Sequence, residues 1–238
     1  MLEYNWNKEN YQKFLDCLDK NKDLKYREFH YRLLKDNSIE FIGVRTPILK
    51  NIAKQISKTK YIEFIKLNTL KTYEEKTIYG LLLGYLKIDF NDLLNLIDNN
   101  YLINIDNWAT CDLTCANLKI FKKNKEIGFN YLKNKINSNN IWIQRFVIVM
   151  FLDYFLCDEY IDDVLKIISN IYTNEYYVEM AIAWLLATAY INYPDKVLSL
   201  LKSSKISKNI INLTIKKTNE SYRITKEKKK LIKNLKTI

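Results

Sequence analysis

The stretch Asp106-Asn107-Trp108-Ala109-Thr110-Cys111-Asp112 combines the start of a helix with an indole and a carboxylate. Asp106 or Asn107 is expected to be the N-cap, because a side-chain oxygen at that position accepts a hydrogen bond from the first turn. Residues four apart share one helix face, so Trp108 and Asp112 can contact one ligand together. The alternative is an ordinary helix start with a core tryptophan and a surface aspartate.

The composition favours helices throughout the chain. Hydrophobic residues make up 48% of the 238 residues, which is enough for a continuous core. Four glycines and two prolines are too few for a turn-rich β-sandwich or barrel. The chain also has neither a GxGxxG motif nor a P-loop, which argues against a nucleotide-binding α/β domain. We therefore expect an all-α fold.

Helix starts recur at a nearly constant interval. Pairs of helices repeated about every 35 residues are typical of an α-solenoid, and the absence of a TPR consensus favours HEAT-like repeats. We predict one domain over 1–238, curved with a basic concave face: N-terminal helices in 1–70, central repeats in 72–202 and a basic helical cap in 203–238. The expected starts are Thr72, Asp106, Asn140 and Glu175, at intervals of 34, 34 and 35 residues, with partner helices from Asp89, Asn124, Asp158 and Pro194.

The N-terminal part predicts helices over 8–18, 25–35, 46–56 and 61–67. Thr46 is expected to cap the third of these, with Pro47 as its first residue. In the second, aromatic and basic residues alternate, which could suit a nucleic-acid backbone. The favoured interpretation is that Phe29 and Leu33 pack inward while the other side chains are solvated. Thr72 and Glu75 predict a capping box for the helix that follows.

The net charge of +11 is concentrated near the C-terminus. From Ser203 onward, eleven lysines and arginines face two glutamates, which leaves about +2 for the preceding residues. Such a segment favours nucleic acid as partner, with an anionic membrane as second choice, although a solvated lysine-rich surface is an alternative. No membrane-spanning or leader segment is recognisable, so we expect a cytoplasmic protein.

The four cysteines show no framework spacing, and His30 is the single histidine. Cys111 and Cys115 lie four residues apart but have too few partners for a metal site. Buried free thiols are the favoured interpretation, and we expect neither a metal nor a cofactor.

Three of the expected helices place polar and aromatic residues in one register. Counted from residues 106, 140 and 175, Trp108 and Asp112 have offsets 2 and 6, Arg145 has offset 5 and Trp184 has offset 9. These offsets form one helical stripe, which predicts a shared functional wall; the helix expected at Thr72 does not follow the register. Neighbouring offsets are expected to carry the core: Ala109, Leu113 and Ala116; Ile143, Val147 and Met150; Val178, Ile182 and Leu185.

Six blocks of sequence resemble the DNA alkylation repair family of AlkD-like HEAT-repeat DNA glycosylases. The resemblance runs from about residue 25 to the C-terminus, and its middle blocks are specific. The N-terminal helices, around residues 26–34, match the family less closely. The blocks are Gly43-Val44-Arg45-Thr46-Pro47, Tyr73-Glu74-Glu75-Lys76, residues 106–112 as quoted above, Trp142-Ile143-Gln144-Arg145-Phe146, residues 176–186 (YYVEMAIAWLL) and Glu220-Ser221-Tyr222-Arg223.

The resemblance implies an enzyme that hydrolyses the glycosidic bond of purines alkylated at N3 or N7, without flipping the base. Asp112 would be the catalytic carboxylate, and Trp108 and Trp184 would pack against the deoxyribose of the lesion. Arg145 would hold the adjacent DNA backbone. Further DNA-binding residues are expected at Arg45, Lys216, Lys217 and Arg223.

The expected partner is double-stranded DNA with alkylated purines, bound by a monomer that needs no metal and no membrane. Two rival hypotheses stay open at this point. The first is a DNA-binding HEAT-repeat homologue with weak or no excision activity. The second is a non-catalytic protein scaffold, for which the basic tail is an interaction arm.

Overall fold

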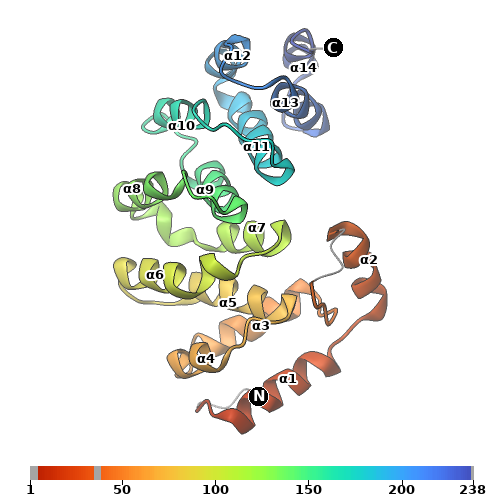
Figure 1. Ribbon diagram of the computed structural model, residues 1–238, viewed down its shortest axis with the longest axis vertical. Helices are drawn as coiled ribbons and strands as arrows, with labels where there is room; N and C mark the ends of the chain where they lie inside the picture. Colours follow the sequence, from red (N-terminus) through yellow and green to blue (C-terminus); the bar gives the residue numbers. More distant parts are fainter. Residues whose placement is uncertain (1–4, 35–38, 237–238) are drawn as a thin grey trace. The chain divides into compact units, whose positions relative to one another are not determined.

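The computed structural model describes residues 5–34 and 39–236. This part of the chain has fourteen α-helices and no β-strand, which confirms the prediction of an all-α fold (Figure 1). Its extended segments form only two isolated bridges, between Lys22 and Val44 and between Glu40 and Thr72. In the same ranges, every helix is too short or too polar to cross a lipid bilayer.

The chain divides into two compact units, residues 1–120 and 121–238. In the first unit, α3 packs against α5 and α5 packs against α7, while α1 packs against α4. A π-helical turn and a 3-10 turn, Ile97–Tyr101 and Leu102–Asn104, lead into α7. The helices of this unit are α1 (Lys8–Lys20), α2 (Leu24–Leu34), α3 (Thr46–Ile56), α4 (Tyr61–Leu67), α5 (Tyr73–Tyr85), α6 (Phe90–Leu96) and α7 (Trp108–Asn117).

The second unit repeats this pattern of alternate helices in contact. Here α9 packs against α11, and α11 packs against α13, while α8 and α12 lie beside α9 and α11. The 3-10 turn Lys119–Lys122 joins the two units in sequence. The helices of the second unit are α8 (Lys125–Lys135), α9 (Ile141–Tyr154), α10 (Ile161–Ile168), α11 (Tyr176–Asn192), α12 (Pro194–Lys202), α13 (Lys208–Glu220) and α14 (Lys226–Lys233).

Most of the predicted helix starts are confirmed by the caps. Thr72 and Glu75 form the predicted capping box, and Asn140 caps α9. Asn107 rather than Asp106 caps α7, so that start lies one residue later. α10 begins at Ile161 after an N-cap at Tyr160, two residues beyond the start expected near Asp158. The cap of α3 was wrong: Arg45 precedes the helix without a side-chain cap, which makes Thr46 helical and moves Pro47 to the second position.

The prediction that Phe29 and Leu33 pack inward on α2 was wrong. Phe29 is 58% exposed and Leu33 is 42% exposed, while His30 and Leu34 are buried. The His30 ring stacks on Phe41 with centroids 4.9 Å apart, and this aromatic contact rotates the adjacent face of α2 inward.

The predicted core positions of α7 were also wrong. Leu113 is half-buried and Ala116 is exposed, and Ala109 is half-buried as well. The reason is a close approach of α5: a Cβ atom on Gly80 would lie 1.9 Å from Thr114 Oγ1. Thr114 lies against Gly80, and Thr110 Oγ1 lies 3.5 Å from Thr77 Oγ1 of α5. The buried residues of α7 are accordingly small: Thr110, Cys111, Thr114 and Cys115. On α9 and α11 the predicted core residues are buried except for the half-buried Ile143.

Candidate functional site

The first turn of α7 is fixed by a chain of polar contacts. Lys76 of α5 pairs with Asp106, and only 14% of its side chain is exposed. Asp106 accepts a hydrogen bond of 2.9 Å from the Asn107 side-chain amide, and the Asn107 amide oxygen accepts one of 2.9 Å from the Thr110 backbone. An ion pair with a largely buried lysine and a helix cap therefore hold the turn that carries Trp108.

Tyr101 supports the same helix from the π-helical turn before it. Its hydroxyl oxygen lies 2.6 Å from Thr114 Oγ1 and 3.1 Å from the Thr110 carbonyl oxygen. Burial raises the pKa of Tyr101 well above its ordinary value, so the hydroxyl stays protonated and donates. These contacts fix the rotation of α7 about its axis.

Trp108 and Asp112 lie one turn apart on α7, and both side chains are half-buried. The buried residues 110, 111, 114 and 115 occupy one face of this helix. Positions 108 and 112 flank that face, at the boundary with the exposed side. The indole and the carboxylate therefore share one side of α7 in the unit of residues 1–120, as the spacing predicted.

Trp184 interrupts an otherwise buried run on α11. Between Ala181 and Leu186 every residue is buried except Trp184, which is 38% exposed. An exposed indole on an otherwise buried, apolar helix segment can offer its flat ring to a ligand. The structure thus places Trp184 where it can reach an outside partner.

Arg145 is almost buried, at 6% exposure, beneath the start of α11. Its Nη1 donates a hydrogen bond of 2.7 Å to the carbonyl oxygen of Tyr177. The Trp142 ring lies against the Tyr177 ring, with centroids 4.8 Å apart. Contacts between α9 and α11 therefore orient the guanidinium.

The remaining predicted DNA-binding residues differ in how far their charges are already engaged. Arg45 pairs with Asp23 at 2.8 Å, and its guanidinium lies 5.2 Å from the centre of the Tyr26 ring. Lys217 pairs with Glu220 at 3.0 Å. Lys216 and Arg223 are exposed, on α13 and after it.

Glu74 holds the loop that precedes Arg45. This buried carboxylate accepts backbone hydrogen bonds from Ile42, Gly43 and Val44, at 3.0, 2.7 and 3.1 Å. Burial raises its pKa, although the three N–H groups favour the charged form. Gly43 has a φ of +105°, a backbone conformation that glycine adopts without strain.

The two units contribute different parts of the predicted set. Trp108, Asp112 and Arg45 belong to residues 1–120, and Arg145 and Trp184 to residues 121–238, on the packed pair α9 and α11. Lys216, Lys217 and Arg223 belong to the same second unit.

Sequence reasoning missed the residues that support the site. Tyr101 and Tyr177 act through hydrogen bonds between helices, and helical periodicity carries no signal for such contacts. Lys76 lies in one of the blocks that resemble the DNA alkylation repair family, but the sequence did not predict its ion pair with Asp106.

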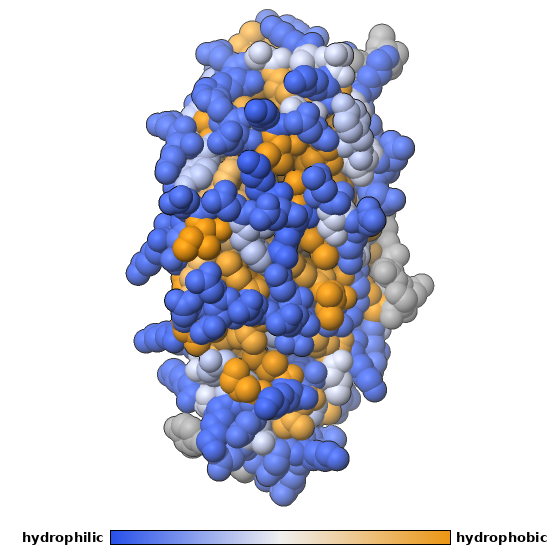
Figure 2. Space-filling view, turned by 60° about the vertical axis from the view of Figure 1, so that its left-hand side comes forward, coloured by the Kyte–Doolittle hydropathy of each residue, from blue (hydrophilic) through white to orange (hydrophobic). Residues whose placement is uncertain are grey.

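The four cysteines are free thiols that differ in burial. Cys111 and Cys115 are buried free thiols, as predicted, whereas Cys17 and Cys157 are only half-buried. Within the described ranges, no group of three or more His, Cys, Asp or Glu side chains could hold a metal ion. Figure 2 shows one face of the molecule, on which hydrophilic side chains are interspersed with apolar patches.

Comparison with known proteins agrees with the sequence blocks. No curated protein matches the chain. The model of the DNA alkylation repair enzyme family matches residues 12–218, which is most of the chain and includes Trp108, Asp112, Arg145 and Trp184. This 238-residue chain belongs to the DNA alkylation repair enzyme family.

Proposed function

We propose that this protein is a monofunctional DNA glycosylase that releases cationic N3- and N7-alkylated purines by hydrolysis, without flipping the base. The observation that carries the proposal is the geometry of α7. Trp108 and Asp112 share one side of a helix whose first turn is held by Lys76 and whose rotation is fixed by Tyr101. A carboxylate fixed in this way suits electrostatic catalysis, which depends on preorganised charge.

The chemistry needs little else from the protein. An alkylated purine that already carries a positive charge is a good leaving group, so no general acid is required. Positive charge then develops on the deoxyribose. The Asp112 carboxylate stabilises this charge and orients the attacking water, while the faces of Trp108 and Trp184 attract a cation.

The second unit would hold the DNA backbone. Arg145, oriented by its hydrogen bond to the Tyr177 carbonyl, contacts a phosphate beside the lesion. Lys216 and Arg223 add phosphate contacts, and Arg45 and Lys217 do so after exchanging their carboxylate partners. In this proposal the pattern of alternate helices in contact continues through the whole chain as a HEAT-like solenoid with a basic concave face, and the protein acts as a monomer without metal or cofactor.

The test is to incubate the protein with N-methylated duplex DNA and to measure released bases and alkali-labile sites. Release that depends on Asp112 supports the glycosylase. Tight, salt-sensitive binding without release would leave a DNA-binding homologue. If no DNA binding is found at about 50 mM salt, the protein is better described as a scaffold.

A further inference from the structure

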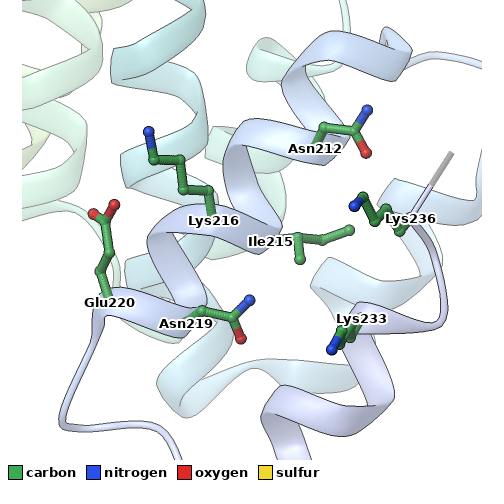
Figure 3. Close-up of a pocket in the computed structure, with 7 residues that line it drawn as sticks. All are labelled: Asn212, Ile215, Lys216, Asn219, Glu220, Lys233 and Lys236. Carbon is green, nitrogen blue, oxygen red and sulfur yellow. The ribbon is translucent and has the colours of Figure 1, made fainter. Parts of the chain in front are cut away.

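The last two helices enclose a basic cleft that the proposed active site does not use. The α13–α14 cleft has a volume of about 420 Å³. Figure 3 shows Asn219 of α13 and Lys233 of α14 on opposite sides of it, with the side chain of Ile215 between the helices. Its lining consists of Asn212, Ile215, Lys216, Asn219, Glu220, Lys233 and Lys236.

The positive charges of the cleft are not balanced within it. Glu220 is its single carboxylate, and Glu220 pairs with Lys217, at 3.0 Å. In the part of the chain that the structure describes, Lys216, Lys233 and Lys236 form no ion pair. Lys233 ends α14, and the Lys236 backbone N–H donates to the Lys233 carbonyl at 3.0 Å, so both side chains belong to one turn of the chain that lines the cleft. An anion between α13 and α14 would balance the lysine charges of the cleft.

The other lysines of α14 have different roles. Lys228 Nζ donates to the Ile191 carbonyl at 2.9 Å, and Lys229 Nζ donates to the Asn219 carbonyl at 2.9 Å. Lys226 and Lys230 are exposed and do not line the cleft. The helix therefore carries three kinds of lysine: those that pack the helix onto the protein, those exposed outside the cleft, and Lys233, which faces α13.

We propose that the α13–α14 cleft is a phosphate-binding site for a nucleic-acid strand, with Lys233 and Lys236 as its ammonium donors. The Asn212 and Asn219 amides supply neutral groups beside these charges, and N–H groups of both kinds bind phosphate oxygens. The site adds Lys233 and Lys236 to the DNA-backbone contacts of the proposed function, and it shares Lys216 with them. Because it concerns the binding of undamaged DNA, it does not depend on excision.

Nucleic acid fits this lining better than a membrane surface does. A helix that lies in a lipid interface needs a broad apolar face. On α14 the apolar Ile232 is buried in the protein, which leaves Leu231 as the exposed aliphatic side chain of the helix, 56% exposed. Five of the seven residues that line the cleft carry an ammonium or amide group.

The experiment compares two double variants of the full chain that lose the same charge. Lys233→Gln with Lys236→Gln removes the proposed phosphate ligands, and Lys226→Gln with Lys230→Gln is the matched control. Affinity for an undamaged labelled duplex is measured by fluorescence anisotropy over a range of salt concentrations. Thermal unfolding of both variants confirms that each one folds.

The slope of log affinity against log salt is expected to fall by about 1.8 in the first variant, since each lost phosphate contact accounts for about 0.9. The control should retain most of the wild-type slope. Equal changes in the two variants would mean that only net charge matters, and would overturn the proposal.

Two further measurements identify the source of the phosphate. If a nucleoside monophosphate, at matched ionic strength, displaces the duplex from the wild type but not from the Lys233/Lys236 variant, the cleft binds single phosphate groups as well as strands. If the wild type sediments with anionic vesicles while the DNA slopes of both variants stay at the wild-type value, the cleft is not a nucleic-acid site.

Discussion

Helices α7 and α11 present the candidate residues in opposite ways. On α7, Trp108 and Asp112 stand beside a buried face of threonines and cysteines, and polar contacts from Lys76, Asn107 and Tyr101 fix the helix. On α11, Trp184 emerges from a run of purely apolar residues. A charged group needs an exact orientation to act on a reaction, whereas a ring needs only to be exposed on a rigid helix.

The largest effect should come from the carboxylate of α7. Asp112→Asn keeps the size of the side chain but removes the charge that stabilises the transition state in the proposed mechanism. We expect excision to fall by at least a hundred- to thousandfold, the range seen when one electrostatic contact to a transition state is removed. Affinity for duplex DNA should stay equal or rise, because a charge that repels phosphate is gone.

Single-turnover release of methylated purines and anisotropy with the same duplex measure the two quantities. Excision by the Asp112→Asn variant at the wild-type rate would place the catalytic group elsewhere.

A smaller effect on excision is expected for α11, where the adjacent residues Trp184 and Leu185 allow an exposed and a buried side chain to be compared. Trp184→Ala should lower excision and cost little stability, because the indole is 38% exposed. Leu185→Ala, at 0% exposure, should instead destabilise the fold by about 2–5 kcal/mol.

Urea denaturation separates the two variants of α11. A loss of stability in Trp184→Ala as large as that in Leu185→Ala would show that the indole is a core residue. Trp108→Ala, on the half-buried position of α7, should fall between the two in stability and should also lower excision.

The polar support of α7 can be tested with a pair of tyrosines. Tyr101→Phe removes the hydroxyl and leaves Thr114 Oγ1 without it in a buried contact, at an expected cost of about 1–3 kcal/mol. Tyr79 stacks on Tyr101 with centroids 6.2 Å apart, and its hydroxyl contacts the Leu96 carbonyl at 3.4 Å and the Asn100 side chain, but not α7. Tyr79→Phe also removes a buried tyrosine hydroxyl but leaves the Tyr101 contacts to α7 in place, so it is the matched control for excision.

A role in positioning requires more than a change in stability. For Tyr101→Phe, excision should decrease in kcat at a temperature where the variant is fully folded, while DNA affinity stays unchanged. A drop in affinity with an unchanged kcat would contradict the view that Tyr101 orients α7 for chemistry.

The sequence predicted the helices better than it predicted their faces. Caps such as Thr72 and Asn140 are local signals, and they placed the starts of α5 and α9 correctly. The inward faces of α2 and α7 were wrong because they depend on partners from other helices: His30 on Phe41, and Thr114 against Gly80. Glycine in one helix made room for small polar residues in another, and no periodicity in α7 alone contains that information.

The same distinction applies to the candidate site. The spacing of Trp108 and Asp112 was readable because a helix places residues four apart on one side. The hydrogen bond from Arg145 to the Tyr177 carbonyl could not be predicted in this way, because every residue has a backbone acceptor and none of them leaves a signal in the sequence. Trp184 was predicted in part. The helical register put it on the same stripe as the other candidates, but only the packing of α11 shows that its indole reaches the surface.

The smallest effect is expected for the size of the adduct, and it tests both helices together. A glycosylase that flips a base into a closed pocket rejects bulky lesions. Here Trp108 and Asp112 are half-buried at the boundary of the buried face of α7, and Trp184 is 38% exposed on α11. If they act on the deoxyribose while the base stays stacked, a large cationic N7 adduct should be released within about tenfold of the rate for a methyl adduct, a difference of about 1.4 kcal/mol in activation free energy. Neutral lesions such as deaminated bases should not be released, because their leaving groups lack the positive charge. Parallel single-turnover assays on duplexes of one sequence measure these rates. A decrease of a thousandfold or more for the bulky adduct would indicate a closed pocket and would contradict the proposal that the base stays stacked.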